Sequence, residues 1–400
     1  YKTPYGIQMN IGVQRELRPG LVLSVDYLRN RGVHFNLTRD RNRIGAADTL
    51  NPLLAFFAMQ RTFDDFECGD VDCVIESGGS ISNFADNGLG AGAGRDGFAF
   101  SGNNPNFRHM GIIEPQGLSL FQALQVRLTG DIGKLERLGI RRLYTNITYQ
   151  LGRFESTGID QDFLSTAGFN DRPTKFFGPA NLDRTHQIGV SFLMDLPLGF
   201  TVNTTNSFRS ALASSMFLPA TTGGADEIFF SDLDGDGVSQ DPLSGVTPRG
   251  AFSRKVTSGS INKFIANYNS TFAGTVGPAG QALVAAGLFS EAQLISLGAV
   301  LTSVAQAPSG QVNNDSFFNS DIRISRPIKI TEHWSVEPML EIFNLFNVAN
   351  YTALSGVLDG GTGDTNGTTA STRPTRVGQG SGSFSPGTQR AVQFGVRVRF

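Results

Sequence analysis

The sequence is poor in charged residues and has no long hydrophobic run, and each shortage excludes a class of protein. Charged residues make up 17% of the chain, whereas soluble domains contain about 25%. No apolar run approaches the roughly 20 residues of a membrane-spanning helix. The 33 basic and 35 acidic residues give a formal net charge of -2, without the basic excess of proteins that bind nucleic acid. We therefore expect no nucleic-acid partner.

Catalytic motifs are also missing from the sequence. The four histidines are far apart, at His34, His109, His186 and His333. None of them has a Cys, Ser or Glu at a catalytic spacing, and neither G-x-S-x-G nor H-E-x-x-H occurs, the patterns that mark common hydrolases. The sequence therefore predicts no enzyme.

Cysteine is nearly absent, and the two cysteines lie close together. Cys68 and Cys73 flank a short segment of Gly, Asp and Val. This spacing is typical of a small disulfide loop formed in an oxidising compartment. A metal site is the weaker interpretation, because no second pair of Cys or His accompanies them. We therefore expect a disulfide between Cys68 and Cys73.

Strict alternation of apolar and polar residues is the strongest positive signal. From Tyr5 to Gln14 every odd position is apolar, and every even position is Gly, Gln or Asn. Successive side chains of a β-strand point to opposite faces, so the pattern predicts strands with one apolar and one polar face. It recurs near 21–27, 120–129, 143–151, 188–194, 200–208, 318–330, 336–343 and 392–400. The sequence predicts about nine strands, each near the 9–11 residues that cross a bilayer when tilted.

The connections between these strands alternate between very short and very long. The short ones are 18–20, 134–139, 197–199 and 331–334, and the long ones are 39–116, 157–183, 219–315 and 352–389. Outer-membrane barrels have short periplasmic turns and long extracellular loops. We therefore expect an all-β fold, an antiparallel transmembrane β-barrel in the bacterial outer membrane with long extracellular loops. A soluble, secreted β-sandwich that binds glycans is a rival, but it would have no reason to place every long loop at one end.

Several features indicate part of a larger barrel rather than a complete small one. A small barrel fills its interior with packed side chains, whereas the predicted polar face carries amide and charged groups, which suit a hydrated lumen. These residues are Gln125, Arg127, Gln187, Asp321, Arg323, Glu337 and Glu341. Single-chain bacterial barrels also have even strand numbers. We expect residues 1–400 to be the C-terminal segment of an outer-membrane β-barrel, with the plug domain and early strands absent.

Aromatic residues gather at the ends of the predicted strands. They are Tyr5, Tyr27, Phe35, Tyr149, Phe154, Phe200, Trp334, Phe346 and Tyr351. Outer-membrane barrels carry aromatic girdles at both membrane interfaces. The rival interpretation is a set of ordinary anchors for the loops. We favour the girdle, because the short turns carry Phe200 and Trp334.

Five segments make the sequence resemble the TonB-dependent outer-membrane transporters, most closely their Oar-like branch. The segments are Gly12–Gly20, Gln122–Arg127, Asp232–Gly237, Glu341–Asn347 and Val396–Phe400, and the resemblance spans essentially the whole chain. It implies a barrel of about 22 strands with a plugged lumen, energised through TonB by way of an N-terminal region not present here. It also implies that the barrel-assembly machinery recognises the terminal Phe400. The simpler interpretation is that Phe400 continues the lipid-facing row of Val392 to Val398, and both can hold.

The functional hypothesis is TonB-dependent uptake of a bulky nutrient across the outer membrane, with an unknown extracellular substrate first contacted by the loops. The alternative is a structural or adhesive barrel that binds a surface partner through those loops. Outer-membrane lipid is the expected surrounding in both cases. The sequence does not assign substrate-binding residues.

The loop before the seventh strand contains carboxylates at alternate positions, Asp232, Asp234 and Asp236, with Asp241 following. Such residues ahead of a glycine resemble a calcium-binding loop. An EF-hand is excluded, because Leu243 stands where its twelfth-position Glu would be. Two interpretations remain, a looser hard-cation site for calcium and a solvated acidic turn. No other cofactor is expected.

The same loop contains a predicted pair of short helices. Residues 281–286 have a helical composition, with Gly287 at the position of a C-terminal cap. Ser290 and Gln293 form the pattern of a capping box, which predicts a second helix that ends near Leu297. The pair could close over a ligand or shield the loop's own apolar residues, and we favour the second interpretation.

Overall fold

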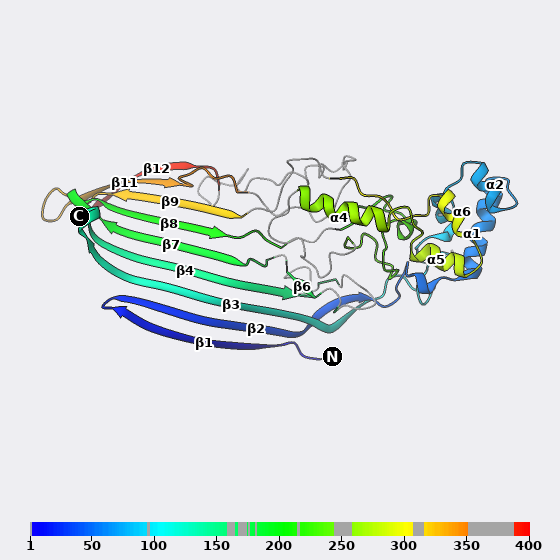
Figure 1. The fold of residues 1–400 in the computed structure, drawn as a ribbon, viewed down its shortest axis with the longest axis horizontal. Helices are drawn as coiled ribbons and strands as arrows, with labels where there is room; N and C mark the ends of the chain where they lie inside the picture. Colours follow the sequence, from blue (N-terminus) through cyan, green and yellow to red (C-terminus); the bar gives the residue numbers. More distant parts are fainter. Residues whose placement is uncertain are drawn as a thin grey trace.

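The computed structural model describes residues 2–400 except 94–96, 158–164, 167–173, 175–176, 181, 214–216, 244–257, 307–315 and 351–387. It consists of a long, curved antiparallel sheet with a helical region at one end (Figure 1). Within the described residues, no helix is both long enough and apolar enough to cross a membrane. The two long connections 157–183 and 352–389 of the sequence prediction lie mostly outside these residues, as does Tyr351.

Nine strands of nine residues or more form the sheet, as the alternation predicts. They are β1 (Tyr5–Arg18), β2 (Leu21–Asp40), β3 (Gly111–Leu135), β4 (Ile140–Ser156), β7 (His186–Asp195), β8 (Thr201–Arg209), β9 (Phe317–Ser325), β11 (Ser335–Phe343) and β12 (Ala391–Arg399). Three strands of two residues join them: β5 (Ser165–Thr166), β6 (Gly178–Pro179) and β10 (Ile328–Lys329).

One predicted strand is wrong in its length, because the alternation predicts that it continues from Phe318 to Ile330. The structure ends β9 at Ser325 and begins β10 at Ile328, with Arg326 and Pro327 between them. Proline has no backbone N–H to donate, so it interrupts a ladder of strand hydrogen bonds.

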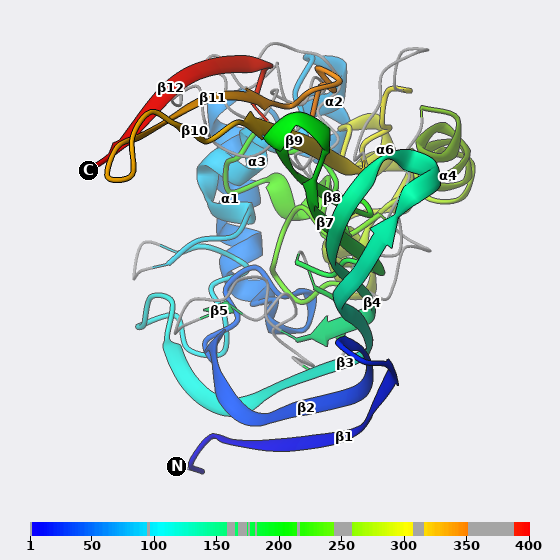
Figure 2. The ribbon, with the colours of Figure 1, turned by 90° about the vertical axis from the view of Figure 1, so that its left-hand side faces the viewer.

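The long strands follow one another around the sheet in the order β1, β2, β3, β4, β7, β8, β9, β11 and β12, and every neighbouring pair is antiparallel. Viewed from its end, the sheet is an open arc with β1 and β12 at its two edges (Figure 2). Among the described residues, β1 pairs only with β2 and β12 pairs only with β11.

The register places all the apolar rows on one face of the arc. Ile11 lies opposite Tyr27, Tyr27 opposite Leu124, and Leu124 opposite Leu151. Many of these side chains are exposed in the isolated chain, with Ile11 at 76% and Phe394 at 80%. An apolar surface of this extent is rare on soluble proteins and marks a face that contacts another apolar phase.

The short and long connections lie at opposite ends of the sheet, as expected. Figure 1 shows the turns β1–β2, β3–β4 and β7–β8 at one end, together with the C-terminus, and the described parts of the β2–β3 and β8–β9 connections at the other. The last strand therefore runs toward the end with the short turns, as predicted. The ladder between β2 and β3 reaches from Leu21 opposite Gly130 to Asp40 opposite Gly111, so these two strands extend toward the helical region.

The helical region is formed by the connections β2–β3 and β8–β9, and we call its described residues 41–110 and 217–306 the cap. Its helices are α1 (Pro52–Asp65), α2 (Val71–Glu76), α3 (Ile81–Phe84), α4 (Ser258–Thr271), α5 (Pro278–Ala285) and α6 (Glu291–Ser296). Short 3-10 or π turns also occur at η1 (Ala47–Thr49), η2 (Ala85–Leu89) and η6 (Glu227–Phe229), with η3 (Glu136–Leu138) and η5 (Pro197–Gly199) in the short turns of the sheet.

The predicted helix pair is confirmed as α5 and α6. Gly287 has the positive φ of 70° that ends α5, and the side chain of Ser290 accepts a hydrogen bond from Gln293 N–H in the predicted capping box. The first four helices were not predicted.

We expect Gly130→Ala to prevent correct assembly of the sheet. Gly130 has a φ of 142°, and a Cβ there would lie 1.8 Å from the carbonyl oxygen of Gly20 in the β1–β2 turn. The strained backbone alone costs about 1–3 kcal/mol, and the overlap must also separate β2 from β3. The fraction of folded protein can be measured in detergent by the shift in gel mobility on heating. Gly6→Ala is the matched control, since nothing lies within 4 Å of its added Cβ; equal folding of the two variants would contradict the prediction.

Candidate functional site

The polar face of the sheet carries amide and charged side chains that contact one another across strands. Gln125 on β3 donates from Nε2 to Oε1 of Gln150 on β4 at 2.9 Å. Arg127 donates from Nε to Oδ1 of Asn146 at 3.1 Å. Amide and guanidinium groups have more donors and acceptors than these contacts use. This polar face, which we call the polar wall, can therefore bind water or a polar solute.

The register confirms the residues that the sequence analysis assigned to the polar face. Arg323 on β9 lies opposite Glu341 on β11, with 3.6 Å between Nε and Oε1. Arg397 on β12 lies opposite Glu337, with 3.5 Å between Nη1 and Oε2. All the assigned residues share this face: Gln125, Arg127, Gln187, Asp321, Arg323, Glu337 and Glu341.

A hollow of about 430 Å³ opens in this wall across β3, β4, β7 and β8. Gly189 leaves room for it, because a Cβ at that position would lie 2.7 Å from Oγ1 of Thr148. The lining includes two arginines, Arg127 and Arg209. With two cations beside amides and hydroxyls, the hollow suits a polar or anionic solute.

The cap has an apolar core in which residues from both long connections meet. Phe84 is fully buried, and its ring meets those of Phe63 and Phe289 edge to face, with centroids 6.3 Å and 5.3 Å away. Polar contacts join the same two connections, since Gln293 Nε2 donates to Oδ1 of Asp72 at 2.8 Å. The two connections therefore pack together around this core, while α4 packs in a second apolar cluster that includes Tyr268. Helices α5 and α6 cover apolar residues, the interpretation that the sequence favours.

The predicted disulfide is present in the cap. Cys68 and Cys73 are joined with an S–S distance of 2.09 Å and a Cα–Cα distance of 5.6 Å. The bridge closes the corner between α1 and α2, and the side chain of Asp70 caps α2 by accepting a bond from Cys73 N–H at 2.9 Å.

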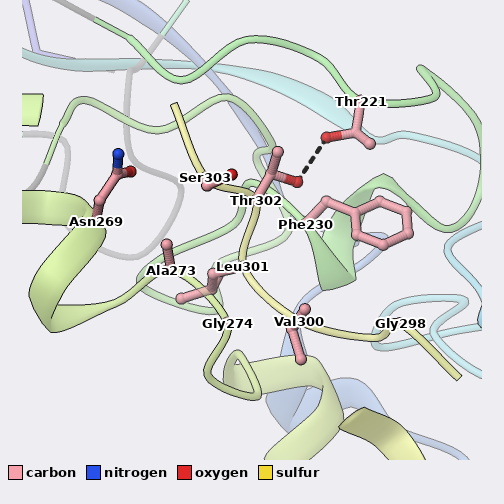
Figure 3. Close-up of a pocket in the computed structure, with 10 residues that line it drawn as sticks. All are labelled: Thr221, Phe230, Asn269, Ala273, Gly274, Gly298, Val300, Leu301, Thr302 and Ser303. Atoms are coloured by element: carbon pink, nitrogen blue, oxygen red, sulfur yellow. Dashed lines mark hydrogen bonds between the residues drawn. The ribbon is translucent and has the colours of Figure 1, made fainter. Parts of the chain in front are cut away.

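An open pocket of about 570 Å³ lies on the cap between the segment that follows β8, the end of α4 and the segment 298–303 that follows α6 (Figure 3). Hydroxyl groups and apolar side chains share its wall. Thr221 and Thr302 are joined there by a hydrogen bond of 2.8 Å between their Oγ1 atoms. The labelled side chains carry no charge, so the pocket suits an uncharged ligand. No sequence pattern marked these residues, because they come from segments that meet only in the folded cap.

The acidic loop of the sequence analysis lies in the cap, where three of its four carboxylates meet. One oxygen from each of Asp232, Asp234 and Asp241 lies within 4.8 Å of the others. Asp236 is outside this group, and its Oδ1 accepts a hydrogen bond from Val238 N–H at 2.8 Å. Asp232 and Asp241 are buried, at 1% and 3% exposure. The structure thus joins Asp232, Asp234 and Asp241 and leaves Asp236 to the backbone of the turn.

Burial and crowding raise the pKa of both buried carboxyls in this loop. Burial is the largest cause for Asp232, followed by repulsion from Asp236, and its pKa rises to about 7. Burial again dominates for Asp241, followed by repulsion from Asp232 and Asp234, and its pKa rises to about 9. The loop therefore holds its carboxyl groups so close together that the negative charge of one disfavours the ionisation of another.

The segment Glu341–Asn347, which carries part of the family resemblance, ends β11 and joins it to both neighbours. Asn344 is buried with a positive φ of 46°. Its backbone N–H donates to Oδ1 of Asp321 on β9 at 2.8 Å. Its side-chain Nδ2 donates to the carbonyl of Thr388, just before β12, at 2.6 Å. These residues therefore have a structural role in the sheet.

The end of the chain lies at the rim that carries the short turns. The ring of Phe400 is 91% exposed, and its centroid is 5.5 Å from that of Trp334. The guanidinium of Arg326 stacks over the ring of Phe200 at 5.2 Å. Two of the predicted rim aromatics, Trp334 and Phe200, thus lie on this edge beside Phe400, and the role of Phe400 in assembly remains a prediction.

Comparisons with known proteins give a family match and a structural likeness. Residues 1–393 match the family described as "Outer membrane beta barrel domain". The structure is similar to the outer membrane transporter YddB from Escherichia coli, with a TM-score of 0.46 and 8% identity, covering 100% of this chain and 33% of that one. It is also similar to P. aeruginosa FpvA, solved with a pyoverdine and iron, with a TM-score of 0.37 and 7% identity, covering 98% and 27%. The chain thus spans a third or less of these structures. No curated protein matches the sequence.

We expect Phe84→Ala to loosen the cap without unfolding the sheet. Removing a buried Phe costs about 3–5 kcal/mol, and Phe84 contacts both connections that form the cap core. Limited proteolysis should cut the variant within the cap, while its heat-dependent gel mobility stays unchanged. Phe56→Ala is the matched control, because Phe56 is 47% exposed on α1. Equal resistance of the two variants would show that Phe84 does not join the connections.

Proposed function

Because the chain belongs to the family of outer membrane beta barrel domains and is therefore an outer-membrane protein, we propose that it is part of a transporter for a bulky nutrient. In this proposal, uptake is energised through TonB, and residues 1–400 are the C-terminal segment of the barrel. The plug domain and early strands belong to a preceding part of the protein.

The polar face of the sheet is the observation that carries this proposal. It holds amides, two guanidinium groups beside a hollow, and cross-strand ion pairs. Outer-membrane barrels in general turn polar side chains inward, but a barrel that only anchors a surface domain has no need for a hollow lined by arginines and amides. A transporter can use one, because its solute crosses the membrane in contact with the inner face.

The open arc supports the proposal that further strands complete the barrel. The outer edges of β1 and β12 expose backbone N–H and C=O groups. In the hydrocarbon region each unpaired group costs several kcal/mol, so membrane sheets close on themselves. We propose that early strands of the same protein pair with both edges.

The alternative function is a structural or adhesive barrel that binds a surface partner. The cap favours it, since it has its own apolar core and a disulfide and offers a preformed surface. The two functions differ in one measurable respect: adhesion needs no energy and moves no solute.

Energy-dependent depletion of a nutrient from the medium tests the transport proposal. Cells with and without the protein are grown in a defined mixture, and the medium is analysed by mass spectrometry. We expect a solute to disappear only with the protein, and uptake to stop when a protonophore collapses the membrane potential. Binding to the cells that survives the protonophore, without depletion, would favour the adhesive alternative.

The paired substitution Arg127→Ala with Arg209→Ala tests the polar wall directly. Both side chains line the hollow, and a hydrogen bond to a charged group contributes about 1.5–3 kcal/mol. We expect uptake of an anionic solute to fall roughly 10-fold or more, with the protein still assembled. Arg153→Ala is the control, because Arg153 lies in register with Gln122 on the apolar face. The same loss in both proteins would contradict a role for the wall.

A further inference from the structure

The acidic loop contains one buried carboxylate oxygen that has no hydrogen-bond partner. Asp241 is 3% exposed. Its Oδ2 accepts bonds from Leu233 N–H at 2.7 Å and Asp234 N–H at 3.2 Å, whereas its Oδ1 has no partner. A buried polar atom without a partner costs free energy, so a ligand that contacts Oδ1 would remove this cost.

A second buried carboxylate nearby shows how the cap satisfies such a group when no ligand is needed. Glu227 is 5% exposed. Its Oε1 accepts from Ser231 Oγ at 2.5 Å, and its Oε2 accepts from Thr222 and Gly223 N–H at 2.8 Å and 2.9 Å. The side chain of Asp241 therefore differs from a structural carboxylate of the same region.

The backbone holds Asp232 in place. Its Oδ1 accepts a bond from Gly235 N–H at 2.6 Å, and its Oδ2 accepts one from Gly237 N–H at 3.0 Å. Each carboxylate oxygen has further lone pairs. The third member, Asp234, is exposed, so the group is open to solvent on one side. An ion can enter from that side and keep bound water.

The charges around the group call for a cation. The neighbours that act most strongly on Asp232 and Asp241 are other carboxylates. Among the described residues, neither forms an ion pair with Lys, Arg or His. A buried carboxylate is normally paired with a cation or bound to a metal.

We propose that Asp232, Asp234 and Asp241 bind a calcium ion in the cap. The donors are all oxygens, which favour Ca²⁺ or Mg²⁺ over Zn²⁺ and Cu²⁺. Calcium takes six to eight oxygen ligands in flexible geometry, from carboxylates, carbonyls and water, whereas Mg²⁺ demands near-ideal octahedral geometry. A partly exposed group of irregular carboxylates suits calcium better.

The calcium ion would fix the contact between the two connections that form the cap. The acidic loop belongs to the β8–β9 connection, and its Gly235 accepts a hydrogen bond from Ala47 N–H of the β2–β3 connection at 2.9 Å. Gly237 lies against the same segment, where a Cβ would be 2.5 Å from the carbonyl oxygen of Ile44. Binding therefore orders the loop where both connections meet, independently of whether the barrel transports a solute.

Hydrogen exchange of the full-length protein in detergent, with calcium alone as the probe, tests the site. Extracellular calcium modules have dissociation constants of about 0.1–1 mM, so 5 mM Ca²⁺ should slow exchange in segments 231–241 and 44–49 by about 5- to 50-fold. The same concentration of Mg²⁺ should give a smaller effect. Exchange in α1 near Phe56 and in the β-sheet should not respond.

Asp241→Asn separates a calcium ligand from a structural carboxylate. The amide keeps the size of the side chain, cannot become the carboxylate that binds a cation, and can donate to the other carboxylates. We expect exchange without calcium to be no faster than in the native protein, and the response to calcium to be lost. Glu227→Gln should speed exchange with and without calcium but keep the response, and Asp48→Asn, whose side chain is 64% exposed, should behave like the native protein. The proposal fails if calcium has no effect on the native protein or slows exchange equally in Asp241→Asn.

Discussion

The whole molecule depends on one constraint, that each backbone donor and acceptor of a strand in the membrane needs a partner on the next strand. The ladder through nine long strands meets this need along the arc. Once the ladder is set, the register also decides which side chains face lipid and which face the interior, because a shift by one residue would exchange the two faces.

The same constraint extends to polar side chains that the register brings to the apolar face. Asn206 on β8 and Ser320 on β9 lie opposite each other there. Ser320 Oγ donates to Oδ1 of Asn206 at 2.7 Å, and Asn206 Nδ2 donates to the carbonyl of Val190 at 3.2 Å. The two polar side chains thus form hydrogen bonds with each other and with the backbone, which explains how they can lie on the apolar face.

The sheet could be predicted from the sequence because strand alternation is local, whereas most of the cap could not. Helices α5 and α6 were recognisable from their caps, which are also local. Helix α1 begins at Pro52 with Asn51 as its N-cap, a start signal that could have been used, and the side chain of Asn51 accepts hydrogen bonds from two backbone N–H groups. The core that surrounds Phe84 joins residues that lie far apart in the sequence, so no pattern along the chain reveals it.

The acidic loop shows the same limit at a smaller scale. The spacing of its carboxylates indicated a group of four, and the structure brings three together. Asp236 is outside this group, and its Oδ1 accepts a hydrogen bond from Val238 N–H, a backbone contact that spacing does not reveal. The missing partner of Asp241 Oδ1 could be recognised only from the packed cap.

The lengths of β2 and β3 determine how far the cap stands from the bilayer. They contain 20 and 25 residues, and a strand rises about 3.3 Å per residue, whereas 9–11 residues cross the hydrocarbon core. Beyond the parts that pair with β1 and β4, the two strands continue together over Phe35–Asp40 and Gly111–Gly117, a ribbon about 20 Å long. This ribbon carries the β2–β3 connection of the cap beyond the rest of the sheet, so a molecule that diffuses toward the membrane on this side meets the cap first.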